Sequence, residues 1–317
     1  MRITLEDTAK YFLENDNFLL LCHVSPDGDT VGSAAALAYA LKAKGKNVII
    51  KCGDEFTKDF TFMVENLACD EFEPEHIVAI DVADPKLLGD DFKVIYSDKV
   101  ELCIDHHSSN VNYSEMLYLE PDSASTAEII YILINLMNVE ITPLIASCLF
   151  TGVSTDTGCF RFSNTTVRTF EIAAKLAEKG ADTYNIVQIF FETKTKTYAS
   201  LERMALDTMR LYCDDRCAIL YVTQEMYKRS GSNETETTKL ASLPRQIEGV
   251  LVGALMRELK DGSWKISLRT HGDVDASAIA GRLGGGGHAG AAACTISESR
   301  VVATNLLLKE IQAEISA

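Results

Sequence analysis

Histidine and aspartate residues that could bind metal ions occur in four short segments of the first half of this 317-residue chain. The segments are His23-Val-Ser-Pro-Asp27-Gly-Asp29, the single residue Asp81, the triplet Asp105-His106-His107, and Ser154-Thr-Asp156-Thr-Gly158. Imidazole and carboxylate ligands without thiolates suit Mn²⁺ or a related divalent cation. Two such cations about 3.5–4 Å apart can activate a water molecule and clamp the oxygens of a phosphoryl group. These residue types therefore predict a two-cation site for phosphoester hydrolysis.

The elements that carry these segments could bring them together. Apolar runs predict buried strands, and an Ala/Leu-rich run predicts a helix at Val31–Lys44. The predicted strands are Phe18–Cys22, Asn47–Lys51, His76–Ile80 and Val100–Ile104. Continuous apolar strands separated by helices are typical of a mostly parallel α/β sheet with helices on both faces. Three segments follow such strands, and the fourth follows a predicted helix that ends at Phe150. Because ligands bind outside the carboxyl ends of strands in open α/β sheets, we expect the four segments to converge.

Each segment also has an ordinary structural explanation. A single aspartate after a strand usually caps a helix or forms a turn, so Asp81 alone indicates little. The triplet Asp105-His106-His107 alone could also be structural, whereas the spacing His-x-x-x-Asp-x-Asp after an apolar strand is more specific. Three of the six histidines of the chain lie in these segments. The combination, rather than any one segment, favours a metal site.

A second candidate site lies near the C-terminal end, where four glycines, Gly284–Gly287, precede His288. Consecutive glycines allow backbone N–H groups to approach an anion closely, and His288 can add a further donor. A predicted strand ends at Arg269, whose guanidinium suits bidentate recognition of phosphate, although it could equally be an ordinary surface residue. Arg245 and Arg257 are further candidates for phosphate contacts.

The remaining pattern predicts two domains. Residues 124–150 and 166–192 are predicted to be helical, with a break at Gly180. Strands predicted at Cys217–Val222, Gly249–Glu258 and Trp264–Arg269 indicate a smaller C-terminal α/β domain, and Ser230–Thr238 is predicted to be a mobile loop. We expect a catalytic, metal-binding domain at residues 1–190, a helical connector at 191–210 and a substrate-binding domain at 211–317.

Charge and cysteine content narrow the class of partner. The formal net charge of −16 disfavours a protein that binds long duplex nucleic acid, because such proteins usually neutralise phosphates with a basic surface. The negative net charge is compatible with a small anionic substrate, because bound cations reverse the local electrostatic field.

The nine cysteines contain no C-x-x-C pair, which favours reduced, buried thiols. No apolar run reaches the roughly 18 residues of a membrane span, so we expect a cytoplasmic protein without a membrane partner.

The four metal-binding segments resemble the motifs of the DHH phosphoesterase superfamily. The motif that gives the family its name stands here as Asp105-His106-His107. The preceding motifs stand as His23/Asp27/Asp29 and Asp81, and the fourth stands as Asp156. The strand that ends in arginine and the Gly-Gly-Gly-His run resemble the C-terminal DHHA1 domain of one subfamily. The resemblance covers nearly the whole chain in the order of the family.

The resemblance implies a role for each matching residue. His23, Asp27 and Asp81 would hold one cation. Asp29, Asp81, His106 and Asp156 would hold a second cation, with Asp81 bridging the two. His107 would face the scissile phosphate, and Asp105 would orient the motif. Residues that would bind the substrate in the DHHA1 domain are Arg269, Gly286, Gly287 and His288.

The size and layout resemble the bifunctional oligoribonuclease (nano-RNase) and pAp phosphatase subfamily. This resemblance implies hydrolysis of very short oligonucleotides to mononucleotides, of 3′-phosphoadenosine 5′-phosphate to AMP, or of both, with two divalent cations, by preference Mn²⁺. The substrate would contact both domains. Hydrolysis of pApA or cyclic di-AMP is an alternative, and a nucleotide-binding sensor without catalytic activity is an alternative of another class. The pattern is compatible with a homodimer.

Overall fold

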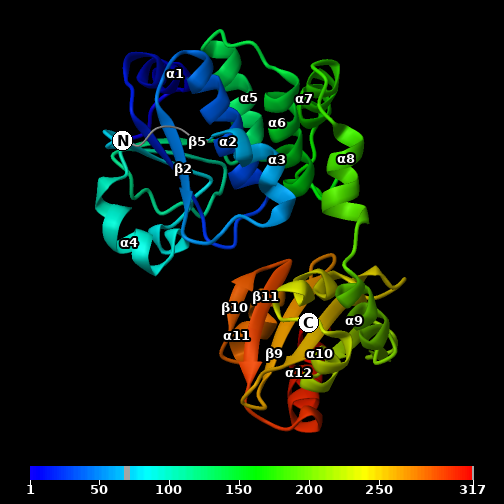
Figure 1. The fold of residues 1–317 in the computed structure, drawn as a ribbon. Helices are drawn as coiled ribbons and strands as arrows, with labels where there is room; N and C mark the ends of the chain where they lie inside the picture. Colours follow the sequence, from blue (N-terminus) through cyan, green and yellow to red (C-terminus); the bar gives the residue numbers. More distant parts are fainter. Residues whose placement is uncertain (68–71, 316–317) are drawn as a thin grey trace. The chain divides into compact units, whose positions relative to one another are not determined.

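Five parallel strands form the centre of the first of two units, Met1–Thr193, in the computed structural model, which describes residues 1–67 and 72–315 (Figure 1). The strands are β1 (Phe18–Cys22), β2 (Val48–Cys52), β3 (His76–Ile80), β4 (Leu102–Asp105) and β5 (Met116–Leu119). Their order is β2-β1-β3-β4-β5, and every neighbouring pair is parallel. The predicted parallel sheet is confirmed, and it contains one strand, β5, that was not predicted.

Helices cover both faces of this sheet because its strands are apolar on both sides. Leu20 packs with helices α2, α5 and α6, whereas Leu19 and Leu21 pack on the side of α4 (Figure 1). The α-helices are α1 (Leu5–Glu14), α2 (Gly28–Ala43), α3 (Thr61–Val64), α4 (Asp90–Tyr96), α5 (Thr126–Leu136), α6 (Pro143–Asp156), α7 (Val167–Glu178) and α8 (Thr183–Val187). Shorter helical turns are η1 (Lys58–Phe60), η2 (Glu65–Leu67), η3 (Pro85–Leu88), η4 (Ser97–Lys99) and η5 (Gln188–Glu192).

Two helix boundaries differ from the predicted ones. Helix α2 begins at Gly28, so Asp29 lies in its first turn and not in a loop. Helix α6 does not end at Phe150 but continues to Asp156. In its polar C-terminal half, threonine hydroxyls are satisfied within the helix, because they donate to carbonyls one turn earlier, as Thr155 Oγ1 does to the carbonyl of Thr151 at 2.8 Å. The fourth metal-binding segment is therefore the end of a helix.

Helices α2 and α6 pack closely because glycines lie between them. A Cβ atom at Gly32 would lie 2.4 Å from the carbonyl oxygen of Cys148, and one at Gly152 would lie 2.8 Å from Oδ1 of Asp29. Real Cβ atoms do not tolerate such distances, so only glycine permits this approach. The packing places the first turn of α2 beside α6.

A six-stranded mixed sheet forms the second unit, Lys194–Ala317 (Figure 1). Its order is β10-β11-β9-β8-β7-β6, with β7 and β8 parallel and the other pairs antiparallel. The strands are β6 (Arg210–Tyr212), β7 (Cys217–Val222), β8 (Val252–Glu258), β9 (Trp264–Thr270), β10 (Gly286–His288) and β11 (Ala291–Ile296). The helices are α9 (Lys196–Leu206), α10 (Gln224–Ser230), η6 (Thr235–Ser242), η7 (Pro244–Gln246), α11 (Ala276–Arg282) and α12 (Arg300–Ile315).

The two faces of the second sheet are covered differently. Alternate residues of the central strands, such as Leu268, pack against α11 and α12. Leu220 and Leu255 point to the other face and pack against α9, α10 and η6. The hydrophobic cluster that contains Leu220 and Leu255 includes no residue of β10 or β11. The uncovered part of this face of the sheet therefore lies at the edge formed by β10 and β11.

Further features expected from the sequence can be compared with the described residues. The loop predicted at Ser230–Thr238 is wrong in its second part, because η6 begins at Thr235 and Thr237 is buried, whereas residues 231–234 connect α10 to η6 without regular structure. The glycine run is not a loop throughout, because its last two glycines and His288 form edge strand β10. The described cysteines carry free thiols, five of them buried, while Cys69 lies outside the described residues. Among the described helices, none has the length and apolar character needed to cross a membrane.

Candidate metal centre

The first segment acquires its shape from the start of helix α2. Asp27 is the N-cap of this helix, and its Oδ1 accepts hydrogen bonds from the backbone N–H groups of Asp29 (3.0 Å) and Thr30 (3.1 Å). His23 Nδ1 lies 2.9 Å from the carbonyl oxygen of Val24, so a proton on Nδ1 would leave Nε2 free as a ligand. His23 Nε2 lies 3.6 Å from Asp27 Oδ1.

Asp81 follows β3 in an unusual backbone conformation. Its φ of +63° lies in the left-handed region, which is costly for a residue other than glycine. Its backbone N–H donates to the carbonyl of Ile104 at 2.9 Å, and Thr126 Oγ1 donates to its Oδ1 at 2.7 Å. Its carboxylate is only 2% exposed. Asp81 therefore stands outside the carboxyl end of β3, next to β1, where the strand order reverses and open α/β sheets bind ligands.

Asp105 is saturated with hydrogen bonds from its own motif. Its Oδ1 accepts from the backbone N–H groups of His106 (2.8 Å) and His107 (3.1 Å) and pairs with His107 Nδ1 at 2.8 Å. Its Oδ2 accepts from Asn110 Nδ2 at 2.7 Å. Burial alone would raise the pKa of Asp105, but the hydrogen bonds from His107 and Asn110 hold it below its usual value. A buried carboxylate bonded in this way can orient the motif.

His106 points its Nε2 atom at three carboxylates. Its Nδ1 lies 3.0 Å from the carbonyl oxygen of Ser123, which orients the ring. The Nε2 atom lies 3.4 Å from Asp156 Oδ2, 3.8 Å from Asp81 Oδ1 and 3.9 Å from Asp29 Oδ2. This nitrogen is buried and has no hydrogen-bond partner among the described residues. A buried nitrogen surrounded by carboxylates in this way is suited to a cation.

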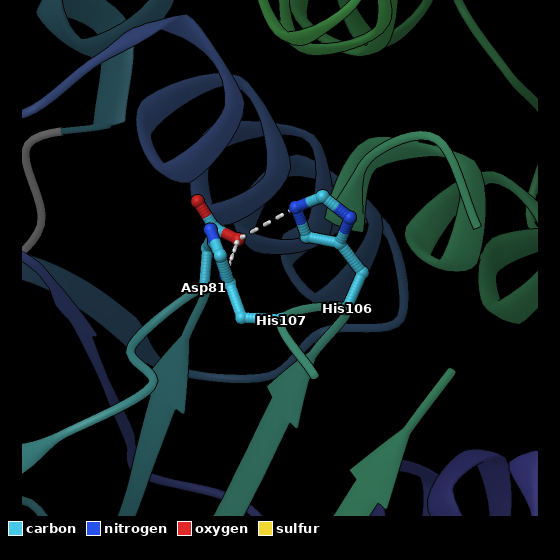
Figure 2. A group of neighbouring side chains, drawn as sticks. All are labelled: Asp81, His106 and His107. Carbon is cyan, nitrogen blue, oxygen red and sulfur yellow. Dashed lines mark ion pairs between the residues drawn. The ribbon is translucent and has the colours of Figure 1, made fainter. Parts of the chain in front are cut away.

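One carboxylate oxygen of Asp81 faces both imidazoles of the third segment, whose ring centroids lie 4.4 Å apart (Figure 2). Its Oδ1 is 3.8 Å from His106 Nε2 and 3.5 Å from His107 Nδ1, while its Oδ2 is 3.8 Å from His23 Nε2. Three groups of side chains have all their ligand atoms within 4.8 Å of one another: Asp81, His106 and His107, and two ligand sets that share no residue. The first ligand set is His23, Asp27 and Asp81, and the second is Asp29, His106 and Asp156. Asp81 belongs to the first set and lies 3.8 Å from His106 of the second, so its carboxylate is placed to be shared.

Asp29, a member of the second ligand set, also accepts hydrogen bonds from the start of helix α5, which hold its carboxylate in place. Its Oδ2 accepts from the backbone N–H of Thr126 at 2.7 Å, and its Oδ1 accepts from that of Ala127 at 2.9 Å. Both donors lie in the first turn of α5, where the helix dipole favours negative charge. This capping role would alone explain a buried aspartate, but it does not explain the proximity of His106 and Asp156.

The cluster has more negative charge than its own residues neutralise. Burial, and next the charge of Asp81, raises the pKa of Asp29. Burial followed by neighbouring carboxylates likewise raises the pKa values of Asp81 and Asp156. The side-chain hydrogen bond to Asp105 raises the pKa of His107 to about 9. Raised pKa values on both acids and bases are expected where carboxylates lack a positive partner, so this donor set fits divalent cations.

Several residues that support the ligands could not be predicted from the sequence. Thr126 binds two of the aspartates, Asn110 binds Asp105, and Ser123 provides the carbonyl beside His106. Buried Glu128 supports this segment, since its Oε2 accepts from Ser123 Oγ at 3.2 Å. The only signal in the sequence is a run of small polar residues before helix α5, which by itself indicates no more than a helix cap.

The candidate substrate-binding residues lie together within the second unit. Arg269 on β9 pairs in register with Ala291 on β11, and Ala291 pairs with His288 on β10. Residues directly opposite one another in antiparallel strands point to the same face, so the side chains of Arg269 and His288 share one face. Gly287 has a φ of +149°, and a Cβ atom there would lie 2.5 Å from Cα of Ala292. Gly286 precedes it on the same strand.

Family models and relatives match both units. A model of the DHH family, N-terminal domain, matches residues 17–153, and a model of the DHHA1 domain matches residues 214–317. The bifunctional oligoribonuclease and PAP phosphatase NrnA of Thermus thermophilus is 32% identical over 288 residues, covering 86% of this chain and 82% of that protein. The cyclic-di-AMP phosphodiesterase GdpP of Geobacillus thermodenitrificans is 26% identical over 335 residues, covering 98% of this chain and 49% of that protein. A crystal structure of an exopolyphosphatase-related protein from Bacteroides fragilis superposes with a TM-score of 0.86 at 23% identity, covering 98% and 96% of the two chains.

Proposed function

Because the chain belongs to the DHH family of phosphoesterases and carries a DHHA1 domain, we propose that it hydrolyses very short oligonucleotides to mononucleotides, 3′-phosphoadenosine 5′-phosphate to AMP, or both. The family resemblance predicted from the motifs is confirmed, and the protein is a hydrolase. The observation that carries the proposal is the convergence of histidines and carboxylates from four segments around Asp81.

The ligand sets support a pair of divalent cations. His23, Asp27 and Asp81 would hold one cation. Asp29, Asp81, His106 and Asp156 would hold the second. When bound, such cations polarise phosphoryl oxygens and make a water molecule more acidic. We propose Mn²⁺ because the ligands combine imidazole with carboxylate and include no thiolate.

His107 and Asp105 are the proposed catalytic pair of the motif. Asp105 pairs with Nδ1 of His107 at 2.8 Å, which fixes the imidazole and leaves its Nε2 available to a substrate. The His107 side chain is 44% exposed, whereas Asp105 is completely buried. His107 would therefore contact the scissile phosphate, and Asp105 would act by positioning it.

Residues of the second unit would bind another phosphate of the substrate. Arg269 and His288 offer donors on one face of the sheet, and Gly286 and Gly287 keep the backbone of β10 free of side chains. A guanidinium can bind phosphate through two parallel hydrogen bonds.

Sequence identity to relatives of named activity ranks the candidate substrates. The NrnA relative is 32% identical and is named for activity on oligoribonucleotides and PAP, which favours these substrates. Similarity to GdpP along 98% of this chain makes a linear or cyclic dinucleotide, such as pApA or cyclic di-AMP, the second candidate. A sensor without catalytic activity is disfavoured because each metal-binding motif retains its ligands.

The test is turnover by the intact 317-residue chain. Release of mononucleotide from pApA and short RNA, of AMP from 3′-phosphoadenosine 5′-phosphate, and of product from cyclic di-AMP is measured with Mn²⁺, Mg²⁺ or EDTA. We expect cation-dependent hydrolysis that His106→Ala abolishes. His76→Gln is the matched control, because His76 begins β3 while Asp81 follows its other end. Full activity of His106→Ala, or nucleotide binding without turnover, would contradict the proposal.

A further inference from the structure

The segment of residues 120–125, between β5 and α5, holds the imidazole of His106 in place. The carbonyl oxygen of Ser123 lies 3.0 Å from Nδ1 of His106 and sets the direction of its Nε2 atom. The backbone N–H of Ser123 donates to the carbonyl of Glu120 at 3.0 Å, and the backbone N–H of Glu120 donates to the carbonyl of Asp105 at 3.1 Å. The orientation of His106 therefore depends on where this segment lies.

The side chain of Glu128 anchors this segment from helix α5. Its Oε2 accepts from Ser123 Oγ at 3.2 Å and from the backbone N–H of Ala124 at 3.3 Å. Glu128 is completely buried. Two neutral donors do not replace the hydration that an ionised carboxylate loses on burial, so this carboxylate needs a positively charged partner.

Arg168, in the first turn of α7, provides that charge. Its Nε atom lies 3.5 Å from Oε2 of Glu128, and its Nη1 and Nη2 atoms pair with the two carboxylate oxygens of Glu120. Within residues 1–67 and 72–315, no other cation forms an ion pair with either carboxylate. A positive charge in the first turn of a helix opposes the helix dipole, so the stability of α7 does not explain this arginine.

Asn164, just before α7, joins the same segment to the metal ligand Asp156. Its Nδ2 donates to the carbonyl of Ala124 at 2.9 Å and to the carbonyl of Asp156 at 3.2 Å. The Nε2 atom of His106 lies 3.4 Å from Oδ2 of Asp156. Residues 164–168 therefore support both of these neighbouring ligands, one through the segment and the other through its backbone.

We propose that Arg168 is a positioning residue of the second ligand set, because it holds the segment that orients His106. Among the described residues it forms ion pairs with Glu120 and Glu128 and not with a metal ligand. This inference rests on the proposed cation site. Groups that orient a metal-binding histidine typically contribute roughly 10- to 100-fold to metal affinity. Arg168 acts one step further from the ligand, so the lower end of this range is expected.

Isothermal titration calorimetry with Mn²⁺ on the intact 317-residue chain tests the proposal. We expect Arg168→Gln to bind Mn²⁺ about 10-fold more weakly at the site that His106→Ala removes, and as tightly as the wild type at the other site. Arg168→Lys keeps the charge but not the planar fork that reaches two carboxylates, so its affinity should lie between those of Arg168→Gln and the wild type. Excess Mn²⁺ should return the kcat of Arg168→Gln to the wild-type value, with an unchanged KM for the substrate.

Arg282→Gln provides the matched control. Arg282 also pairs with two carboxylates, Glu310 at 2.8 Å and Glu314 at 2.9 Å, but it lies on α11 of the second unit. Its side chain is 39% exposed, which is similar to the 33% of Arg168. We expect this variant to bind Mn²⁺ as the wild type does. Wild-type affinity in Arg168→Gln, or equal losses in the two variants, would overturn the proposal.

Circular dichroism in EDTA shows whether Arg168→Gln folds. If it does not fold, Glu120→Gln decides, because this variant removes one charge that holds the guanidinium and keeps the pair between Arg168 and Glu128. We expect it to weaken Mn²⁺ binding at the same site, and wild-type affinity would overturn the proposal. Absence of turnover by a wild type whose Mn²⁺ binding depends on Arg168 would instead count against the proposed function alone.

Discussion

Removal of one buried hydroxyl group is expected to weaken cation binding without removing any metal ligand. Thr126 is completely buried, and its Oγ1 donates a 2.7 Å hydrogen bond to Oδ1 of Asp81, the carboxylate placed to be shared by both ligand sets. The substitution Thr126→Val replaces this hydroxyl with a methyl group of similar size. The backbone N–H of residue 126, which donates to Asp29, remains.

The size of the effect follows from the charge of the acceptor. A hydrogen bond to a charged group contributes about 1.5–3 kcal/mol. This range corresponds to roughly a 10- to 100-fold change in an equilibrium constant. The hydroxyl favours the ionised form of Asp81, which is the form that binds cations. Burial, and next the charge of Asp27, already raises the pKa of Asp81, so loss of the donor should raise it further.

Isothermal titration calorimetry with Mn²⁺ and with Mg²⁺ measures this effect directly. We expect Thr126→Val to bind either cation roughly 10- to 100-fold more weakly than the wild type at neutral pH. Thr126→Ser keeps the hydroxyl and removes only the methyl group, so its affinity should stay close to that of the wild type. Wild-type affinity in Thr126→Val would refute the reasoning. An equal loss in Thr126→Ser would show that packing of the methyl group, and not the hydrogen bond, is responsible.

Two further predictions concern the same region. Burial and a neighbouring carboxylate raise the pKa of Asp29 from 3.8 to about 8 in the folded chain, so its contribution to stability is present below pH 3.8 and is lost as the pH rises toward 8. In EDTA, the melting temperature of Asp29→Asn should therefore fall less between pH 5.5 and 8 than that of the wild type, and parallel curves would contradict this. In Gly152→Ala, the new methyl group would lie 2.5 Å from Cβ of Ala127, so urea unfolding should show a loss of about 1–3 kcal/mol. The helical Gly281→Ala variant has no atom within 4 Å of its new Cβ and should lose no stability, and equal losses in the two variants would argue against a steric cause.

Much of the first unit could be predicted from local pattern. The apolar runs at Phe18–Cys22 and His76–Ile80 match β1 and β3 residue for residue, because fully buried parallel strands leave a continuous apolar signal. The end of helix α6 could not be predicted, because its threonines are compatible with either a loop or a helix. Strand β5 is four residues long, too short to be distinguished from a loop.

The residue types of the metal centre and their order along the chain are properties of the sequence itself. His23, Asp81 and the Asp105-His106-His107 triplet were found because several predicted strand ends carry such side chains together, although a single aspartate at a strand end is ordinary. Only the tertiary structure decided which carboxylate is shared and which residues support it, as the contacts of Thr126 with Asp81 show. Those contacts join residues 45 positions apart, and they depend on helix packing that local sequence patterns do not report.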